Sequence, residues 1–274
     1  MPESRVPRPR RYLVCEPTYF TVRYAINPWM HPDVPVDTGL ALIQWRNLVR
    51  AYRDHGHTVE TVPPVPGLPD MVFAANSAVV VGGRVFGSLF HAPQRRPEST
   101  HYDLWFKKAG YEVQRPGSVC EGEGDLVWTG RYVLAGTGFR TTQEAHREVQ
   151  EFFGHPVISL TLVDPHFYHL DTALFVLDDS EGGNNIVYYP EAFSPGSRAV
   201  LAQLYPDAVL ATRDDAMAFG LNSVSDGRHV FIAPQAEALA LRLDDHGYVP
   251  VPVDLSELHK AGGGIKCCTQ EIRS

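Results

Sequence analysis

Apolar positions along the chain recur in a unit that repeats five times. In each unit a segment with helical periodicity ends near a Gly or Pro, and a short apolar segment typical of a strand follows. The helical spacing is clearest where five apolar residues fall on one helix face: Ala41, Trp45, Leu48, Val49 and Tyr52. The five junctions lie at 54–59, 109–113, 153–158, 204–210 and 246–251. This regularity predicts a set of equivalent helix-then-strand units.

Several of the predicted helices carry end signals. Thr141 and Glu144 match a capping box, and Gly154 is placed to end the helix that follows them. Residues 194–195, Ser then Pro, match an N-cap and the first residue of another helix. Gly247 closes the last periodic segment. These signals support helices at the predicted places.

Beyond each junction lies a second segment, also expected to be a strand, with one polar residue in an apolar or glycine-rich setting. These residues are spaced 45 to 53 positions apart and are Asn76, Glu121, His169, Asn222 and Cys267. Because they occupy the same phase of the repeat, we expect a closed ring that gathers them at its centre. The prediction is a single α/β domain over residues 1–274, with a flexible tail over residues 1–10.

The glycine run at residues 262–264 leads to two adjacent thiols, Cys267 and Cys268. Glycines allow the backbone to approach where side chains would clash. Neighbouring residues of a strand point to opposite faces, so one thiol is expected at the site and the other in the core. A cysteine, a histidine and a carboxylate from different units can form a nucleophilic site, which assigns Cys267, His169 and Glu121 to catalysis.

Composition narrows the function classes. The chain has 274 residues, of which 44% are hydrophobic and 20% charged, and its formal net charge is −8. That charge argues against binding nucleic acid through phosphates and leaves room for a small cationic substrate. No apolar run approaches the ~18 residues of a membrane span, and the basic N-terminus lacks the apolar core of a signal peptide.

The cysteines also bear on compartment and cofactors. Cys15 and Cys120 are isolated, and with the adjacent pair they form neither a disulfide framework nor a zinc-ligand spacing. We therefore expect a cytoplasmic protein without a metal ion, and no phosphate-cradling or dinucleotide motif indicates another cofactor. We expect Cys268, Cys15 and Cys120 to be structural and Glu123 to be solvated. The oligomeric state is not readable from the sequence.

The chain resembles the guanidino-group-modifying enzyme superfamily, the five-bladed β/α propellers called penteins. The resemblance covers nearly the whole chain and is carried by the segments 24–30, 69–76, 121–125, 138–141, 167–172 and 266–269. It implies a propeller with pseudo-five-fold symmetry, a central active site and no cofactor. The superfamily includes arginine dihydrolases, dimethylarginine dimethylaminohydrolases, arginine deiminases and amidinotransferases.

The resemblance implies a role for each matching residue. Cys267 corresponds to the nucleophile that attacks the guanidinium carbon to give a thiouronium, and His169 to the general acid and base. Glu121 and Asp171 correspond to carboxylates that bind guanidinium nitrogens, a pairing that suits a planar fork of N–H donors. Further substrate contacts are implied for the α-carboxylate, by Arg140 and Arg95, and for the pocket lining, by Asn27, Asp70 and Asn222.

Asn76 departs from deiminases and dimethylargininases, which usually carry an acidic residue there. Asparagine at this position, the spacing of residues 121–125 and the motif at 24–30 are similar to arginine dihydrolases, which convert arginine to ornithine, CO2 and ammonia. The sequence therefore favours arginine dihydrolase. The alternatives are a dimethylargininase, then a deiminase, an amidinotransferase or a non-catalytic propeller, since a fold does not fix a function.

Overall fold

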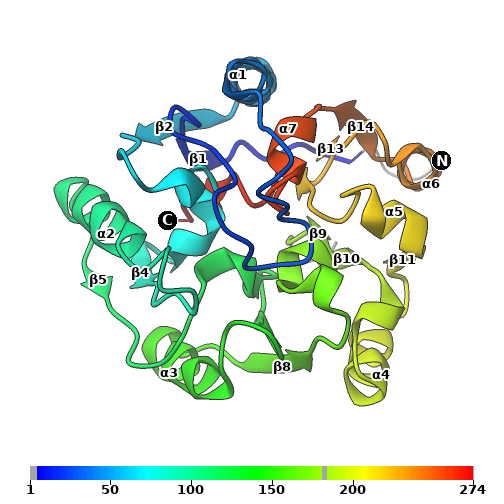
Figure 1. The fold of residues 1–274 in the computed structure, drawn as a ribbon. Coiled ribbons are helices and arrows are strands. Elements are labelled where there is room, and N and C mark those ends of the chain that lie inside the picture. Colours follow the sequence, from blue (N-terminus) through cyan, green and yellow to red (C-terminus); the bar gives the residue numbers. More distant parts are fainter. Residues whose placement is uncertain (1–4, 181–183, 274) are drawn as a thin grey trace.

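The computed structural model describes residues 5–180 and 184–273, and within them the strands form five small sheets arranged in a ring (Figure 1). In each sheet the middle strand is antiparallel to one neighbour and parallel to the strand that follows the helix. The sheets, in strand order, are β15 (Gln270–Glu271), β1 (Arg11–Cys15), β2 (Thr58–Val62); β3 (Ala78–Val81), β4 (Arg84–Gly87), β5 (Val113–Gln114); β6 (Leu126–Trp128), β7 (Val133–Thr137), β8 (Val157–Thr161); β9 (Leu174–Asp178), β10 (Asn185–Tyr188), β11 (Val209–Leu210); and β12 (Val224–Ser225), β13 (His229–Ile232), β14 (Val249–Pro252).

Helices surround this ring, one before the last strand of each sheet (Figure 1). The helices are α1 (Thr38–Asp54), α2 (Glu98–Lys108), α3 (Gln143–Phe153), α4 (Pro195–Leu204), α5 (Arg213–Met217), α6 (Glu237–Asp245) and α7 (Ser256–His259). The five predicted junctions are confirmed as the links from α1, α2, α3, α4 and α6 to the parallel strand that follows each. The predicted five-bladed β/α propeller is therefore confirmed.

The predicted helix ends are confirmed, except for the N-terminal end of α3. Gly154 takes a left-handed conformation, with φ 70°, at the end of that helix. Its N-cap is Thr142 and not Thr141 as predicted, and no side chain caps it. Thr141 is used elsewhere, because its hydroxyl accepts the backbone N–H of Glu121 and its own N–H donates to Asp125.

The segments that carry the five polar residues are turns and not the strands predicted. Each segment contains a backbone N–H bonded to the carbonyl three residues earlier, from Asn76 to Phe73, Gly124 to Glu121, Thr172 to His169, Asn222 to Phe219 and Thr269 to Lys266. This i→i+3 bonding is that of a 3-10 helix, and it satisfies the backbone without a neighbouring strand. The strands β3, β6, β9, β12 and β15 begin only after these turns.

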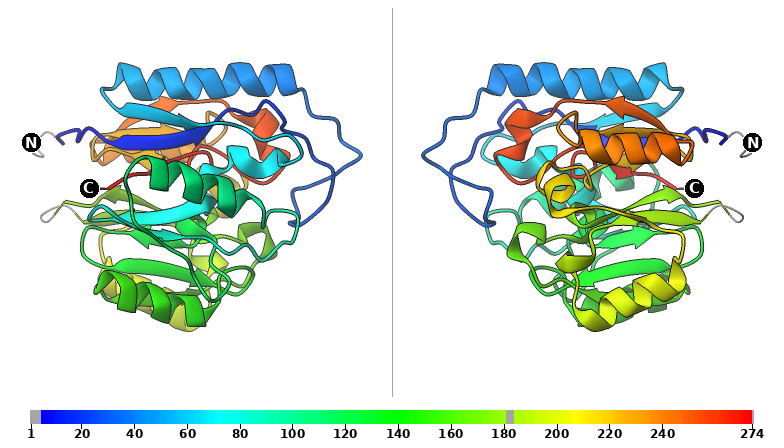
Figure 2. Two further views of the ribbon diagram at one scale, coloured as in Figure 1. Left: turned by 90° about the vertical axis from the view of Figure 1, so that its left-hand side faces the viewer. Right: turned by 90° about the vertical axis from the view of Figure 1, so that its right-hand side faces the viewer.

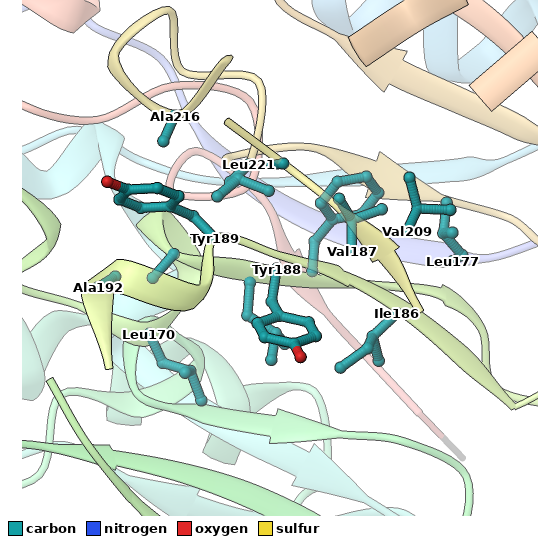
Figure 3. Close-up of a cluster of buried hydrophobic side chains, with 14 of the residues drawn as sticks. Leu170, Leu177, Ile186, Val187, Tyr188, Tyr189, Ala192, Val209, Ala216 and Leu221 are labelled. Carbon is teal, nitrogen blue, oxygen red and sulfur yellow. The ribbon is translucent and has the colours of Figure 1, made fainter. Parts of the chain in front are cut away.

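The blades pack through apolar clusters of buried side chains between the sheets and the helices. The largest joins the third, fourth and fifth sheets around residues such as Leu170, Ile186 and Leu221 (Figure 3). One face of α1 is buried as its periodicity predicts. Burial of this apolar surface is the main favourable term in folding, and it fixes the turns at the centre of the ring.

The two faces of the ring differ. The connection from β1 to α1, residues 16–37, crosses the centre on one face, and both termini lie on the opposite face (Figures 1 and 2). Arg8 and Arg10, expected in a flexible tail, form ion pairs with Asp178 and Asp179. Residues 1–4 of that tail lie outside the described residues. No helix in the described part of the chain has the length and apolar character needed to cross a membrane.

Candidate active site

The Cys267 sulfur lies in a buried network with Asn222 and Asp171. Its thiol donates to Asp171 Oδ2 at 3.2 Å and accepts from Asn222 Nδ2 at 3.1 Å. Asn222 Oδ1 also accepts the backbone N–H of Cys267 at 3.0 Å and that of Gly264. Asn222 therefore holds both the sulfur and the backbone of the nucleophile candidate.

The glycine run lets the Cys267 turn approach its neighbours closely. A Cβ at Gly263 would lie 2.4 Å from the ring of Phe73, and one at Gly262 would lie 2.8 Å from Asn27 Oδ1. Gly262 also has φ +83°, a conformation that favours glycine. The expectation that these glycines allow close backbone approach is confirmed. Cys268, fully buried, packs in an apolar cluster.

The resting thiol is neutral. Burial first, and then the neighbouring carboxylate of Asp171, raise the pKa of Cys267 well above its ordinary value. Burial likewise raises the pKa of Asp171 to about 6. A cation bound beside the sulfur would stabilise its thiolate form, so ionisation of Cys267 is coupled to the arrival of a positive ligand.

His169 is oriented by Glu121. His169 Nε2 lies 2.6 Å from Glu121 Oε2, and no atom of the described residues bonds to His169 Nδ1. Glu121 also accepts from the backbone N–H of His91 and from Arg140. Burial opposes ionisation of Glu121, but Arg140 and His169 outweigh it and lower the pKa of the carboxyl. These contacts leave the ionised Glu121 as a positioning group for His169.

Arg140 bridges the histidine to the long connection across the ring. Its guanidinium donates to Glu121 Oε2 at 3.1 Å and to the carbonyl of Ile26 at 2.6 Å. The same group lies 4.7 Å from the ring centre of Tyr168, whose hydroxyl donates to the Gly262 carbonyl. Arg140 thus ties the 16–37 connection to the catalytic candidates.

Asn76 is oriented by Arg95. The Arg95 guanidinium donates to Asn76 Oδ1 at 2.7 Å and pairs with Glu98. Because a guanidinium can only donate, this contact fixes the amide with Nδ2 pointing away. Asn76 Nδ2 has no partner among the described residues. A Cβ at Gly124 would lie 2.3 Å from that nitrogen and 3.3 Å from His169 Nδ1, so both unpartnered nitrogens flank this glycine.

Asp70 and Asn27 line the same cavity as Cys267. Asp70 accepts from the Tyr24 hydroxyl at 2.7 Å, and its other oxygen has no partner within the described residues. Burial raises the pKa of Asp70. Asn27 donates to the Ala261 carbonyl and accepts the Trp29 N–H, so both ends of its amide hold backbone.

A single cavity collects most of these groups. Its lining consists of Ile26, Asn27, Met30, Asp70, Phe73, Asn76, Arg95, Arg140, Tyr168, Ala261 and Cys267. The other predicted residues lie behind it, since Glu121 contacts Arg140 and in turn His169, and Asp171 and Asn222 contact Cys267. Sequence reasoning missed the apolar and aromatic lining, although Phe73 and Tyr168 stand inside the motifs it used. The binding roles of Arg95 and Arg140 stay predictions.

Glu123 corrects one expectation. It is not solvated but buried, and it pairs with Lys266 at 2.6 Å and with Arg273. Lys266 directly precedes Cys267, so this pairing anchors the nucleophile turn to the second unit of the ring. Across the residues that the structure describes, no group of three or more His, Cys, Asp or Glu side chains is arranged to hold a metal ion.

Comparisons with known proteins agree with this geometry. Residues 29–274 match the family described as N,N dimethylarginine dimethylhydrolase, eukaryotic. The chain is 48% identical to the N(G),N(G)-dimethylarginine dimethylaminohydrolase of Mycobacterium tuberculosis, over 99% of this chain and 88% of the relative. It is 33% identical to the bifunctional arginine dihydrolase/ornithine cyclodeaminase ArgZ of Synechocystis, over 96% of this chain and 37% of that longer protein.

Solved structures support the same relationship. The N-terminal domain of ArgZ, crystallised as a cysteine-to-serine mutant bound to substrate, superposes with a TM-score of 0.91 at 31% identity, over 97% of this chain and 98% of that domain. A dimethylarginine dimethylaminohydrolase adduct matches with a TM-score of 0.76 at 20% identity, which shows the fold alone. The chain therefore belongs to the N,N-dimethylarginine dimethylhydrolase family of guanidino-modifying penteins, enzymes that hydrolyse guanidino C–N bonds.

Proposed function

We propose that this protein is an arginine dihydrolase that uses Cys267 as nucleophile and releases ornithine, CO2 and ammonia. The observation that carries the choice is the buried Asn76 amide, whose Nδ2 donor is unpartnered beside His169. Two relatives support it, since ArgZ and AgrE are both named bifunctional arginine dihydrolase/ornithine cyclodeaminases and their solved structures superpose with TM-scores of 0.91.

The first half of the reaction acts on a cation. Cys267 loses its proton and its sulfur forms a bond to the guanidinium carbon. The C–N bond to a terminal nitrogen then breaks, and that nitrogen leaves as ammonia with a proton from His169. Water, deprotonated by His169, attacks the resulting thiouronium carbon. The C–S bond breaks with its electron pair on sulfur, which yields citrulline and free thiolate.

The second half acts on a neutral urea group. The sulfur of Cys267 attacks the ureido carbon, the remaining terminal nitrogen leaves as ammonia, and water hydrolyses the thiocarbamate. The carbamate so formed loses CO2 to give ornithine, so arginine and two waters yield ornithine, CO2 and two ammonia. A urea oxygen needs a hydrogen-bond donor, and Asn76 Nδ2 can supply one where an ionised carboxylate cannot.

Dimethylarginine hydrolysis is the second candidate. The family match and the 48% identical relative from Mycobacterium tuberculosis both carry that activity in their names. The chemistry of the first half is the same, with dimethylamine as the leaving group and citrulline as the final product. The two candidates differ in the space around the leaving nitrogen and in whether citrulline is attacked.

Product analysis separates the candidates. The purified protein is incubated separately with L-arginine, Nω,Nω-dimethyl-L-arginine and L-citrulline, and the products are identified by mass spectrometry. We expect ornithine from arginine and from citrulline. Dimethylamine with citrulline as end product would instead establish a dimethylargininase, citrulline from arginine alone a deiminase, and arginine loss only with an added amine an amidinotransferase. No turnover of any substrate would contradict the whole proposal.

Replacement of Asn76 tests the residue that carries the proposal. Asn76→Asp replaces the free amide donor by an acceptor, so we expect citrulline to accumulate while the first hydrolysis of arginine continues. The ratio of ornithine to citrulline over a time course measures this. Asn47→Asp, the same change on the exposed side of α1, should leave the ratio unchanged. An unchanged ornithine yield from Asn76→Asp would contradict the assigned role.

A further inference from the structure

A second cavity opens on the face of the ring opposite the 16–37 connection. We name it the rear cavity, and its lining includes Arg10, Tyr12, Asp171, Val176, Ser225 and Arg273. Arg10 and Arg273 stand close in sequence to the two termini, both of which lie on that face (Figure 2). The cavity that contains Cys267, on the face of the 16–37 connection, is named the front cavity and has no lining residue in common with the rear one.

Polar and apolar side chains both line the rear cavity, and the polar ones are incompletely paired. Arg10 pairs with Asp179 at 2.7 Å and with Glu271 at 3.2 Å, and Arg273 pairs with Glu271 at 2.7 Å. Four buried atoms around it have no protein partner within the described residues: Arg10 Nε, Arg273 Nε, Tyr12 OH and Asp171 Oδ1. Leaving such groups without a partner is costly, so the part of the cavity beside these four residues favours bound water.

Asp171 is the partition between the two cavities. It is fully buried and lines the rear cavity, whereas its Oδ2 accepts from the sulfur of Cys267, which lines the front cavity. Its other oxygen, Oδ1, is the unpartnered acceptor. We propose that Asp171 takes the thiol proton of Cys267 and passes it to water in the rear cavity, so that the nucleophile ionises through the face opposite the substrate.

The proton transfer balances without a further reactant. The S–H bond breaks with its electron pair left on sulfur, and the proton forms an O–H bond at Asp171 Oδ2. Rotation about the Cβ–Cγ bond turns that hydroxyl toward the rear cavity, where it protonates water and the carboxylate is restored. The pKa of Asp171, raised by burial to about 6, permits both states near neutral pH. His169, Lys266 and Asp125 are the charged or titratable neighbours of this carboxyl, besides Cys267.

This inference rests on the proposed function, in which Cys267 must lose its proton while substrate is bound. The resting thiol is neutral, and a substrate in the front cavity blocks the direct way from Cys267 to solvent. A cationic guanidinium favours the thiolate, but the proton still requires an acceptor and an exit. The rear cavity offers an exit that the substrate does not occupy.

The first test is crystallographic and needs no substrate. A high-resolution structure of the free full-length chain should show ordered water within hydrogen-bond distance of Asp171 Oδ1, continuing to the mouth of the rear cavity beside Arg10 and Arg273. A dry cavity, or water that stops short of Asp171, overturns the inference. This arm decides the matter even if the wild-type protein turns over no arginine derivative, which would be a failure of the proposed function alone.

The second test obstructs the rear cavity. Val176→Phe should fill it, and we expect kcat to fall about tenfold with KM changed less than about twofold, because proton transfer and not binding is impaired. The solvent deuterium isotope effect on kcat should rise, which a general loss of structure would not produce. Val249→Phe adds the same volume at an exposed residue of β14 outside either cavity and should behave as wild type.

A second obstructing variant keeps the test decisive if Val176→Phe fails to fold. Ser225→Leu narrows the cavity from β12, and Tm measurements identify any variant that fails to fold. A fall of kcat with a raised isotope effect in a folded obstructing variant supports the relay. Wild-type kcat and isotope effect in a folded Val176→Phe or Ser225→Leu protein, with its crystal structure showing the cavity filled, overturn it.

Discussion

The Cys267 thiol donates to Asp171, and burial opposes the charged form of both groups. The repeat and the motifs predicted Cys267 and His169 because both stand at the same phase of the repeat, and their catalytic roles stay predictions. They did not reveal the partners. That Asn222 supports the sulfur, or that Arg95 fixes the amide of Asn76, depends on side-chain geometry between distant units.

Asp171→Asn should stabilise the protein, and more so at higher pH. Burial raises the pKa of Asp171 from its ordinary 3.8 to about 6, so its contribution to folding is full below the unfolded-state pKa and is lost as pH rises through about 6. The variant avoids that loss, worth up to about 3 kcal/mol. Urea unfolding at pH 4.5 and pH 8 measures the difference.

The same comparison needs a control and has a clear negative outcome. Asp207→Asn, at an exposed position after α4, should shift the free energy of unfolding little at either pH. The prediction would be contradicted if Asp171→Asn and wild type differed in free energy of unfolding by the same amount at both pH values. Ionisation of Asp171 would then not lower the stability of the folded protein.

Short turns, one per blade, deliver the polar side chains to the centre. The repeat located all five turns, but their apolar composition suggested strands, because short apolar runs do not distinguish a strand from a buried turn. The capping box at Thr141 failed for a related reason: the threonine serves the Glu121 turn, and the helix begins one residue later. Such contacts connect different elements, so local pattern does not encode them.

Gly263→Ala should displace the Cys267 turn. The added Cβ would meet the Phe73 ring at 2.4 Å and the Cys267 Cβ at 3.1 Å. We expect a stability loss of about 1–3 kcal/mol from overpacking and a fall in kcat of about a hundredfold, since an error near 1 Å in a reacting group has that effect. Urea unfolding and steady-state kinetics measure the two effects.

Two comparisons show whether the clash is the cause. Gly196→Ala, early in α4 with no atom within 4 Å of the added Cβ, should leave both quantities near wild type. The double variant Gly263→Ala with Phe73→Leu should recover part of the lost stability. A Gly263→Ala protein with wild-type stability and kcat would show that the added Cβ does not displace the Cys267 turn, and would contradict the prediction.

The ring as a whole is closed by its last strand. β15 pairs with β1, and Glu123 joins Lys266 and Arg273 across more than half of the sequence. The repeat predicted a ring, since five equal units at one phase favour closure. It could not predict which strand completes the first sheet, or that Glu123 is buried against two cations, because these depend on the register of closure.

Glu123→Gln should weaken this closure. The change leaves Lys266 without its carboxylate partner and Arg273 with only Glu271. Removing one partner of a buried ion pair costs about 3–5 kcal/mol, and the partial exposure of both cations favours the lower end. Urea unfolding at pH 7 measures the loss. Glu112→Gln, an exposed residue before β5, should change stability by less than about 0.5 kcal/mol, and an equal effect of both substitutions would contradict the assignment.

Closure by β15 has a consequence for the order in which the enzyme matures. Cys267 lies three residues before this strand, and its partners Asn222, Asp171 and Glu123 (through Lys266) are made earlier during translation. A growing chain therefore carries most of the lining of the front cavity, from Ile26 to Tyr168, before it carries Cys267. Only after Cys267 and β15 have been made can the turn meet these partners and the first sheet close.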